Sequence, residues 1–67
     1  MHIVTKIREK RKEAGLSQTQ LARVLHVTHA TVSMWETGRN MPSLESIVHC
    51  ADALGCRVDD LIERRQE

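Results

Sequence analysis

The stretch SQTQLARVLHVTHATVSMWETG, residues 17–38, carries the pattern from which the fold can be predicted. Ser17 is followed three residues later by Gln20, the spacing at which two side chains cap the first amides of a helix reciprocally. Apolar residues then recur at helical spacing over 21–25, which gives the helix one apolar face. These features predict a helix over 18–25 that buries one side.

A second helix is predicted to follow after a short corner. The apolar pattern is interrupted for two residues and restarts at Thr28, a residue type that caps helix N-termini. Val32 and Trp35 lie three residues apart on one face, and Gly38 is the residue type that ends helices. The second helix is therefore expected over 29–37.

The outward face of this second helix has an unusual composition. It carries no full charge, only short polar, imidazole and small apolar groups: His29, Ala30, Thr31, Ser33 and Met34. Such groups hydrogen-bond base edges and contact thymine methyls in the major groove of DNA. Two helices joined by a short turn, with the second offered to the groove, form the helix-turn-helix arrangement.

The segment resembles the helix-turn-helix of the phage repressor/Cro family, also called Xre-like regulators. The matching features are the SQxxLA opening, the V-T pair before the second helix, the closing VSMWETG, Pro42 shortly after, and the run ALGCRVDDLI. The resemblance covers roughly residues 3–63. It implies an all-α fold, a compact five-helix lambda-repressor-like domain, with residues 1–67 forming a single helix-turn-helix DNA-binding domain.

The first helix is expected over residues 3–14, with Ile3, Ile7 and Ala14 as its apolar stripe. Arg11 falls on that stripe, where an unpaired cation is costly. The resemblance implies that Arg11 pairs with Glu36. The alternative is that Arg11 reaches solvent as its lysine neighbours do.

The rest of the chain is predicted to add two helices. Ser43 caps a fourth helix that ends at Gly55, and Asp59 caps a short fifth one. The chain after the fifth helix is expected to trail into solvent. The apolar stripe of the fourth helix consists of Leu44, Ile47, Val48, Ala51 and Leu54, and the fifth carries Leu61 and Ile62. At the corner, His26 stands where the family commonly has Gly, so a positive φ there would cost about 1 kcal/mol.

The resemblance also implies roles for individual residues. His29, Ala30 and Met34 would face base edges with Ser33 nearby, and Gln18 would touch a phosphate and brace His29. The residues expected to hold backbone phosphates are Thr31, Thr37, Arg39 and Asn40. Since the family often dimerises through its C-terminal helix, the residues expected at a dimer interface are Val58, Leu61 and Ile62.

The charge distribution agrees with a nucleic-acid partner, although the 67-residue chain has a net charge of only +1. Residues 1–44 carry seven Lys or Arg and three acids, a balance of +4, and residues 45–67 carry three Arg and six acids, a balance of −3. One end is therefore expected to meet phosphates; the alternative is ordinary solvated surface. No apolar run approaches the roughly 20 residues of a membrane span, and no signal peptide is apparent, so a cytoplasmic location is expected.

Several other function classes are disfavoured. Cys50 and Cys56 fit no zinc signature even with His49 adjacent, and are expected to be reduced thiols. His29 and Ser33 lie one helical turn apart without a carboxylate to orient the imidazole, so no enzyme activity is expected. No cofactor, metal, membrane or small-molecule partner is expected.

The sequence thus predicts a double-stranded DNA-binding transcriptional regulator that reads specific sequences through the major groove. We expect a repressor that acts as a homodimer on a palindromic operator. The alternative is an antitoxin or controller-type module whose main role is to bind a protein partner.

Overall fold

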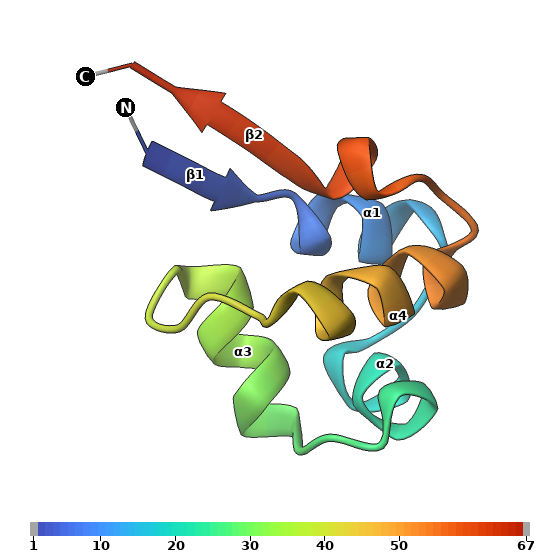
Figure 1. Cartoon of the computed structure of the whole chain (residues 1–67). Helices are drawn as coiled ribbons and strands as arrows, with labels where there is room; N and C mark the ends of the chain where they lie inside the picture. The colour runs from blue at the N-terminus through green and yellow to red at the C-terminus, as the bar shows by residue number, and fades with distance from the viewer. Residues whose placement is uncertain (1, 67) are drawn as a thin grey trace.

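The computed structural model describes residues 2–66, in which four α-helices and one 3-10 helix form the body and two strands form an arm (Figure 1). The elements in order are β1 (His2–Thr5), α1 (Ile7–Glu13), α2 (Gln18–Leu25), α3 (His29–Thr37), α4 (Leu44–Leu54), η1 (Val58–Leu61) and β2 (Ile62–Arg65). The expectation of five helices is wrong at both ends of the chain. No helix within residues 2–66 has the length and apolar character needed to cross a membrane.

The helix-turn-helix pair has the bounds predicted for it. The Ser17 hydroxyl accepts a hydrogen bond from the Gln20 amide at 3.0 Å, and the Gln20 side-chain oxygen accepts one from the Ser17 amide at 2.8 Å. The Thr28 hydroxyl likewise accepts from the Thr31 amide at 3.1 Å and caps α3. These local bonds satisfy amides that have no partner inside the helices, which is why both begin where the sequence indicates.

The N-terminal segment is a strand where the start of a helix was expected. The predicted helix 3–14 is shortened to α1, because the residues before it form β1 and pair antiparallel with β2. Ile3 lies opposite Arg64 in this ladder, and Ile3 is exposed instead of joining a buried helical stripe. Ala14 is also exposed, at the C-terminal end of α1. A run of β-branched residues, Ile-Val-Thr, favours the extended conformation, and the helical spacing masked that preference.

The C-terminal segment differs from prediction for the same reason. A single 3-10 turn, η1, replaces the fifth helix, and Asp59 does not cap it; instead the Asp60 carboxylate accepts from the Arg57 amide at 3.0 Å. The chain then straightens into β2, which gives residues 62–65 a ladder partner instead of a solvated tail. The Lys6 amide donates to the Leu61 carbonyl at 2.7 Å, directly next to the Thr5–Ile62 pair of the ladder.

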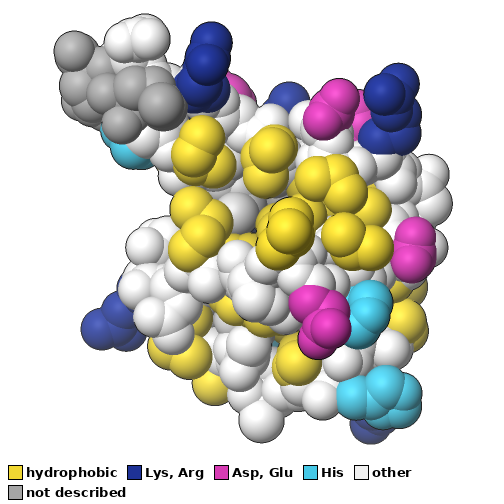
Figure 2. Space-filling view, in the orientation of Figure 1, with side chains coloured by type: hydrophobic (Ala, Val, Ile, Leu, Met, Phe, Trp, Pro, Cys, Tyr) yellow, Lys and Arg dark blue, Asp and Glu magenta, His cyan; other side chains and the backbone are white. Residues whose placement is uncertain are grey.

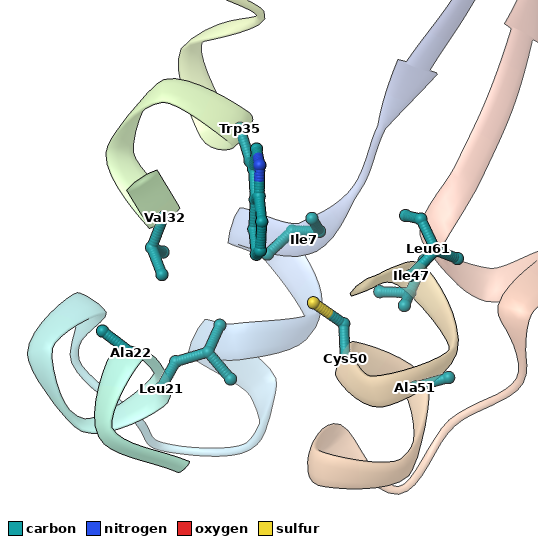
Figure 3. Packing of buried hydrophobic residues seen from close by; sticks show 9 residues of the cluster. All are labelled: Ile7, Leu21, Ala22, Val32, Trp35, Ile47, Cys50, Ala51 and Leu61. Atoms are coloured by element: carbon teal, nitrogen blue, oxygen red, sulfur yellow. The ribbon is translucent and has the colours of Figure 1, made fainter. Parts of the chain in front are cut away.

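The core joins all four helices, with α3 held by two of its side chains (Figure 3). Val32 and Trp35 point from α3 toward the buried residues of the other elements. Those residues are Ile7, Leu21, Ala22, Ile47, Cys50, Ala51 and Leu61. Because one side of α3 is anchored in this way, its other side is presented on a rigid support.

The apolar stripe predicted for α4 is broader than the face that is buried. Ile47 and Ala51 lie in the core as expected, but Leu44 is 78% exposed and Val48 41% exposed. Their helical spacing places all of these residues on one face of α4, but the neighbouring elements cover only part of that face. Two large apolar side chains therefore remain at the surface of α4.

Candidate nucleic-acid interface

The corner between α2 and α3 is built on a left-handed residue. His26 has φ 58° and ψ 40°, and within residues 2–66 it is the only non-glycine residue with positive φ. The Val27 amide then donates to the Ala22 carbonyl at 3.0 Å, which closes the end of α2. Thr28 follows in an extended conformation and starts α3. This geometry sets the angle between the two helices and turns the outer side of α3 away from the core.

The outer side of α3 gathers most of the residues that the sequence marked for base contact. His29 and Ala30 are exposed in the first turn, and Ser33 and Met34 are half-buried one turn later. Residues three or four apart share a helix face, so these four side chains form one surface. None of these four side chains carries a full charge. The one Lys, Arg, Asp or Glu residue in α3 is Glu36, and its side chain is buried in an ion pair with Arg11.

The loop after α3 is fastened to the end of the helix by Met34. The Arg39 and Asn40 amides donate to the Met34 carbonyl at 3.0 and 3.3 Å, and the Asn40 side-chain amide donates to the Met34 sulfur at 3.5 Å. The Arg39 side chain is exposed beside this surface. An exposed guanidinium is a side-chain group that binds phosphates.

The two threonines expected to hold phosphates already have intramolecular partners. The Thr37 hydroxyl donates to the Ser33 carbonyl at 3.0 Å, and the Thr31 hydroxyl shares a 2.9 Å hydrogen bond with the Thr28 hydroxyl. A hydroxyl has one proton to donate, so Thr37 has only acceptor capacity left for another partner. Of the phosphate set, Arg39 is thus the group with a free charge for the task.

Gln18 has a different partner from the one expected. Its side-chain amide donates to Oε1 of Glu36 at 3.0 Å, so it braces the end of α3 and does not brace His29. Glu36 was expected beside Arg11 of α1, but nothing in the sequence indicated that Gln18 of α2 also reaches this carboxylate. Gln18 remains half-buried at the start of α2.

Arg11 and Glu36 form the ion pair that locks α3 to α1. Arg11 Nε donates to Glu36 Oε2 at 2.7 Å and Nη2 donates to Oε1 at 3.1 Å, while Nη1 donates to the Leu16 carbonyl at 2.8 Å. The Arg11 and Glu36 side chains are only 10% and 3% exposed. Burial alone would raise the pKa of Glu36, but hydrogen bonds from Arg11 and Gln18 and the nearby arginine charges lower it below its usual value. Both groups are therefore charged and satisfied.

The residues expected at a dimer interface are not all accessible. Leu61 is 0% exposed in the protomer's own core, which corrects its assignment to an interface. Val58 is half-buried and packs against the core, whereas Ile62 is exposed at the start of β2. Leu44 and Val48 of α4 are exposed apolar residues that the sequence analysis assigned to a buried stripe, because their helical spacing is the same as that of the buried residues.

The cysteines do not form a metal site or a disulfide in this structure. Cys50 is a buried free thiol whose pKa is raised to about 11 by burial and by the neighbouring Cys56. Among residues 2–66, no group of three or more His, Cys, Asp or Glu side chains could hold a metal ion. Cys50 contributes to the core as a small apolar residue.

Comparison with protein families finds one that matches most of the chain. The family described as helix-turn-helix matches residues 7–61, which run from the start of α1 to the end of η1. The matched region includes the whole helix-turn-helix pair and the core that supports it, and it leaves out both strands.

Proteins similar in sequence to this chain are described as transcriptional regulators. An uncharacterized HTH-type transcriptional regulator of Methanothermobacter thermautotrophicus is 49% identical over 51 residues, which cover 76% of this chain and 74% of that protein. The HTH-type transcriptional activator BcrR of Enterococcus faecalis is 31% identical, covering 92% of this chain and 30% of BcrR. The cryptic phage CTXphi transcriptional repressor RstR of Vibrio cholerae is 30% identical, covering 96% of this chain and 57% of RstR. The chain thus spans about a third of BcrR and a little over half of RstR.

Solved structures show the same fold. A putative DNA-binding protein from Bacteroides fragilis superposes with a TM-score of 0.89 at 24% identity, covering 92% of this chain and all of that one. The P22 c2 repressor in complex with a synthetic operator has a TM-score of 0.74 at 30% identity, covering 81% of this chain and 82% of that one.

Proposed function

The chain belongs to the helix-turn-helix family of DNA-binding transcriptional regulators, and we propose that it reads specific duplex sequences by placing α3 in the major groove. The observation that carries the proposal is the outer side of α3, an uncharged surface on a helix whose other side is fixed in the core. Such a surface makes hydrogen bonds and methyl contacts to base edges without the desolvation cost of a charge.

The proposed division of labour follows from side-chain chemistry. His29 offers a ring nitrogen to a base edge, and Ala30 and Met34 offer only apolar contact, which suits a thymine methyl. Ser33 lies between them and can donate or accept. Arg39 meets a phosphate and sets the register of the domain on the duplex without reading sequence. Asn40, Thr31, Thr37 and Gln18 are secondary candidates for the backbone, since each has an intramolecular partner.

We further propose that two copies bind a palindromic operator. A single domain of this size makes few base contacts, and a two-fold dimer doubles them at half-sites about 10 base pairs apart. An exposed apolar surface supports the dimer: Leu44 and Val48 of α4 lie one turn apart, and Figure 2 shows apolar side chains gathered on this face. Ile62 from the predicted interface set is exposed as well. A protein partner on this surface is the alternative, as the antitoxin or controller hypothesis requires.

Repression is the regulatory outcome we propose. RstR and the P22 c2 protein are both named repressors, and the similarity to each covers most of the length of this chain. A domain that occupies the major groove of an operator blocks other proteins from the same site. BcrR is named an activator, so a reporter assay with the operator upstream of or within a promoter decides the sign of regulation.

The proposal is tested by separating base contact from phosphate contact. Met34→Ala should relax preference at one base-pair position per half-site and cost about 1–3 kcal/mol on the best sequence, with little effect on random DNA. Arg39→Ala should weaken specific and random duplexes alike and flatten the slope of log K against log salt by about 1 per protomer. Val24→Ala, which truncates an exposed apolar residue of α2, is the matched control and should change neither property.

If Met34→Ala binds every sequence as the wild type does, the outer side of α3 is not the reading surface. The alternative of a protein-binding module is then favoured.

A further inference from the structure

A cleft of about 730 Å³ opens between the strand arm and the C-terminal end of α3. It is visible in Figure 2 as the hollow below the arm, on the left of the molecule. The four residues of β1 line one side, and the end of α3 with the following loop lines the other. Between them lie Arg8, Glu9 and Lys12 of α1. The family match begins at residue 7, so one wall of the cleft lies outside the shared helix-turn-helix.

The side chains that line this cleft have a net positive charge. Arg8 and Lys12 are four residues apart, so they lie on the same face of α1, and both are exposed. Neither forms an ion pair with any residue in the described part of the chain. Glu36, which also lines the cleft, is neutralised by Arg11. Glu9 is the one other acid in the lining, and Arg65 at the rim is paired with Glu63.

The cleft is continuous with the surface proposed to meet the DNA backbone. Thr37 and Asn40, both candidates for phosphate contact, also line the cleft. A backbone that runs past the end of α3 therefore meets the mouth of the cleft next. Arg8 lies close enough to Glu36 for its charge to lower the pKa of that carboxyl, which places the guanidinium beside the α1–α3 contact.

We propose that Arg8 and Lys12 bind phosphates of the same DNA strand that passes the end of α3, with the strand arm forming the outer wall of this backbone channel. The inference rests on the proposed function, since it extends the DNA contact from α3 and its loop to α1. It predicts a contribution that is independent of sequence, because phosphates carry no base information.

Salt dependence on a random duplex tests the assignment. Each phosphate contact contributes about 0.9 to the slope of log K against log salt. Arg8→Gln and Lys12→Gln should each flatten that slope by about 1 per protomer, and the double variant by about 2. Raising salt from 50 to 200 mM should then weaken each single variant about 3- to 4-fold less than it weakens the wild type. Arg8→Lys should restore the wild-type slope, since it keeps the charge.

Arg57→Gln is the matched control, because its side chain is 83% exposed and it does not line the cleft. Circular dichroism of all variants should match the wild type, as each substitution is at an exposed site. Slopes for Arg8→Gln and Lys12→Gln equal to that of Arg57→Gln would overturn the channel while leaving base reading by α3 intact. Failure of the wild type to bind any duplex would overturn the proposed function and the channel together. If Arg8→Gln and Lys12→Gln keep the wild-type slope with DNA but lose binding to an acidic peptide that the wild type binds, the cleft is assigned to a protein partner and the channel is overturned.

Discussion

Replacing Glu36 with glutamine tests the packing that positions α3. The substitution keeps the volume but removes the charge that faces Arg11, and it turns one acceptor of the two hydrogen bonds into an amide donor. Arg11 is left buried with its bond to the Leu16 carbonyl as its remaining strong partner. Stranding one member of a buried ion pair costs roughly 3–5 kcal/mol.

That loss is large for a domain of this size. Stability is about 5–15 kcal/mol for folded proteins in general, and a small domain has less core to draw on. For a chain of this length, 1 kcal/mol corresponds to about 4–8 °C, so Glu36→Gln should lower Tm by about 12 °C or more. Thermal unfolding followed by circular dichroism measures the shift. Glu13→Gln, which breaks the exposed pair with Lys10, is the control and should cost no more than about 0.5 kcal/mol.

The same pair makes stability depend on pH in a defined direction. The folded-state pKa of Glu36 is lowered, so its stabilising contribution is fully present above the unfolded-state pKa of about 4.3 and is lost as pH falls through the folded value. The free energy of unfolding of the wild type should therefore fall more steeply below about pH 4 than that of Glu36→Gln. A Tm for Glu36→Gln within 2 °C of that of the Glu13→Gln control, on the scale of about 4–8 °C per kcal/mol, would refute the account of this ion pair.

Substitutions at His26 and Leu61 test the corner and the core, with Leu44→Ala as the control for Leu61. His26→Gly should change the free energy of unfolding by no more than about 1 kcal/mol, because relief of the positive φ is offset by a more flexible unfolded chain. A large loss of stability, measured by urea unfolding, would show that the imidazole stabilises the fold. Leu61→Ala should lower the free energy of unfolding by about 2–5 kcal/mol, since the side chain is fully buried. Leu44→Ala, at an exposed site, should change the stability of the monomer by no more than about 0.5 kcal/mol. If urea unfolding gives the two variants equal losses of stability, the C-terminal turn does not pack as described.

The centre of the fold could be predicted from the sequence because its signals are local. Ser17 with Gln20, Thr28 and Gly38 fix helix ends through bonds to residues three or four positions away, so the sequence spacing contains the geometry. Val32 and Trp35 are separated by one helical turn and therefore share the buried side.

The strand arm could not be predicted because its ladder joins residues far apart in the sequence, from Thr5 with Ile62, 57 positions apart, to His2 with Arg65, 63 positions apart. Each half is only four residues long, and neither is recognisable as a strand without its partner. Ile7 and Ile3 have the spacing of one helical face, which made a continuous helix look consistent. The pairing of β1 with β2 overrides that local preference.

The site was predicted where side-chain type alone decides the chemistry, and missed where partners decide it. The uncharged outer side of α3 follows from the residue types between its two buried positions. The bond between Gln18 and Glu36 depends on how α2 packs against α3. The place of the cations at positions 8 and 12, beside the end of α3, depends on how α1 crosses α3. Both are tertiary contacts, and spacing along one helix does not reveal them.

Selection of bound sequences from a random duplex pool tests the central claim most directly. If α3 reads the major groove, the wild-type protein should enrich a single motif, repeated as two inverted half-sites about 10 base pairs apart and containing a thymine at a position that Met34→Ala no longer selects. A pool that shows no enriched motif after repeated rounds, with binding that depends on salt alone, would contradict sequence reading by α3.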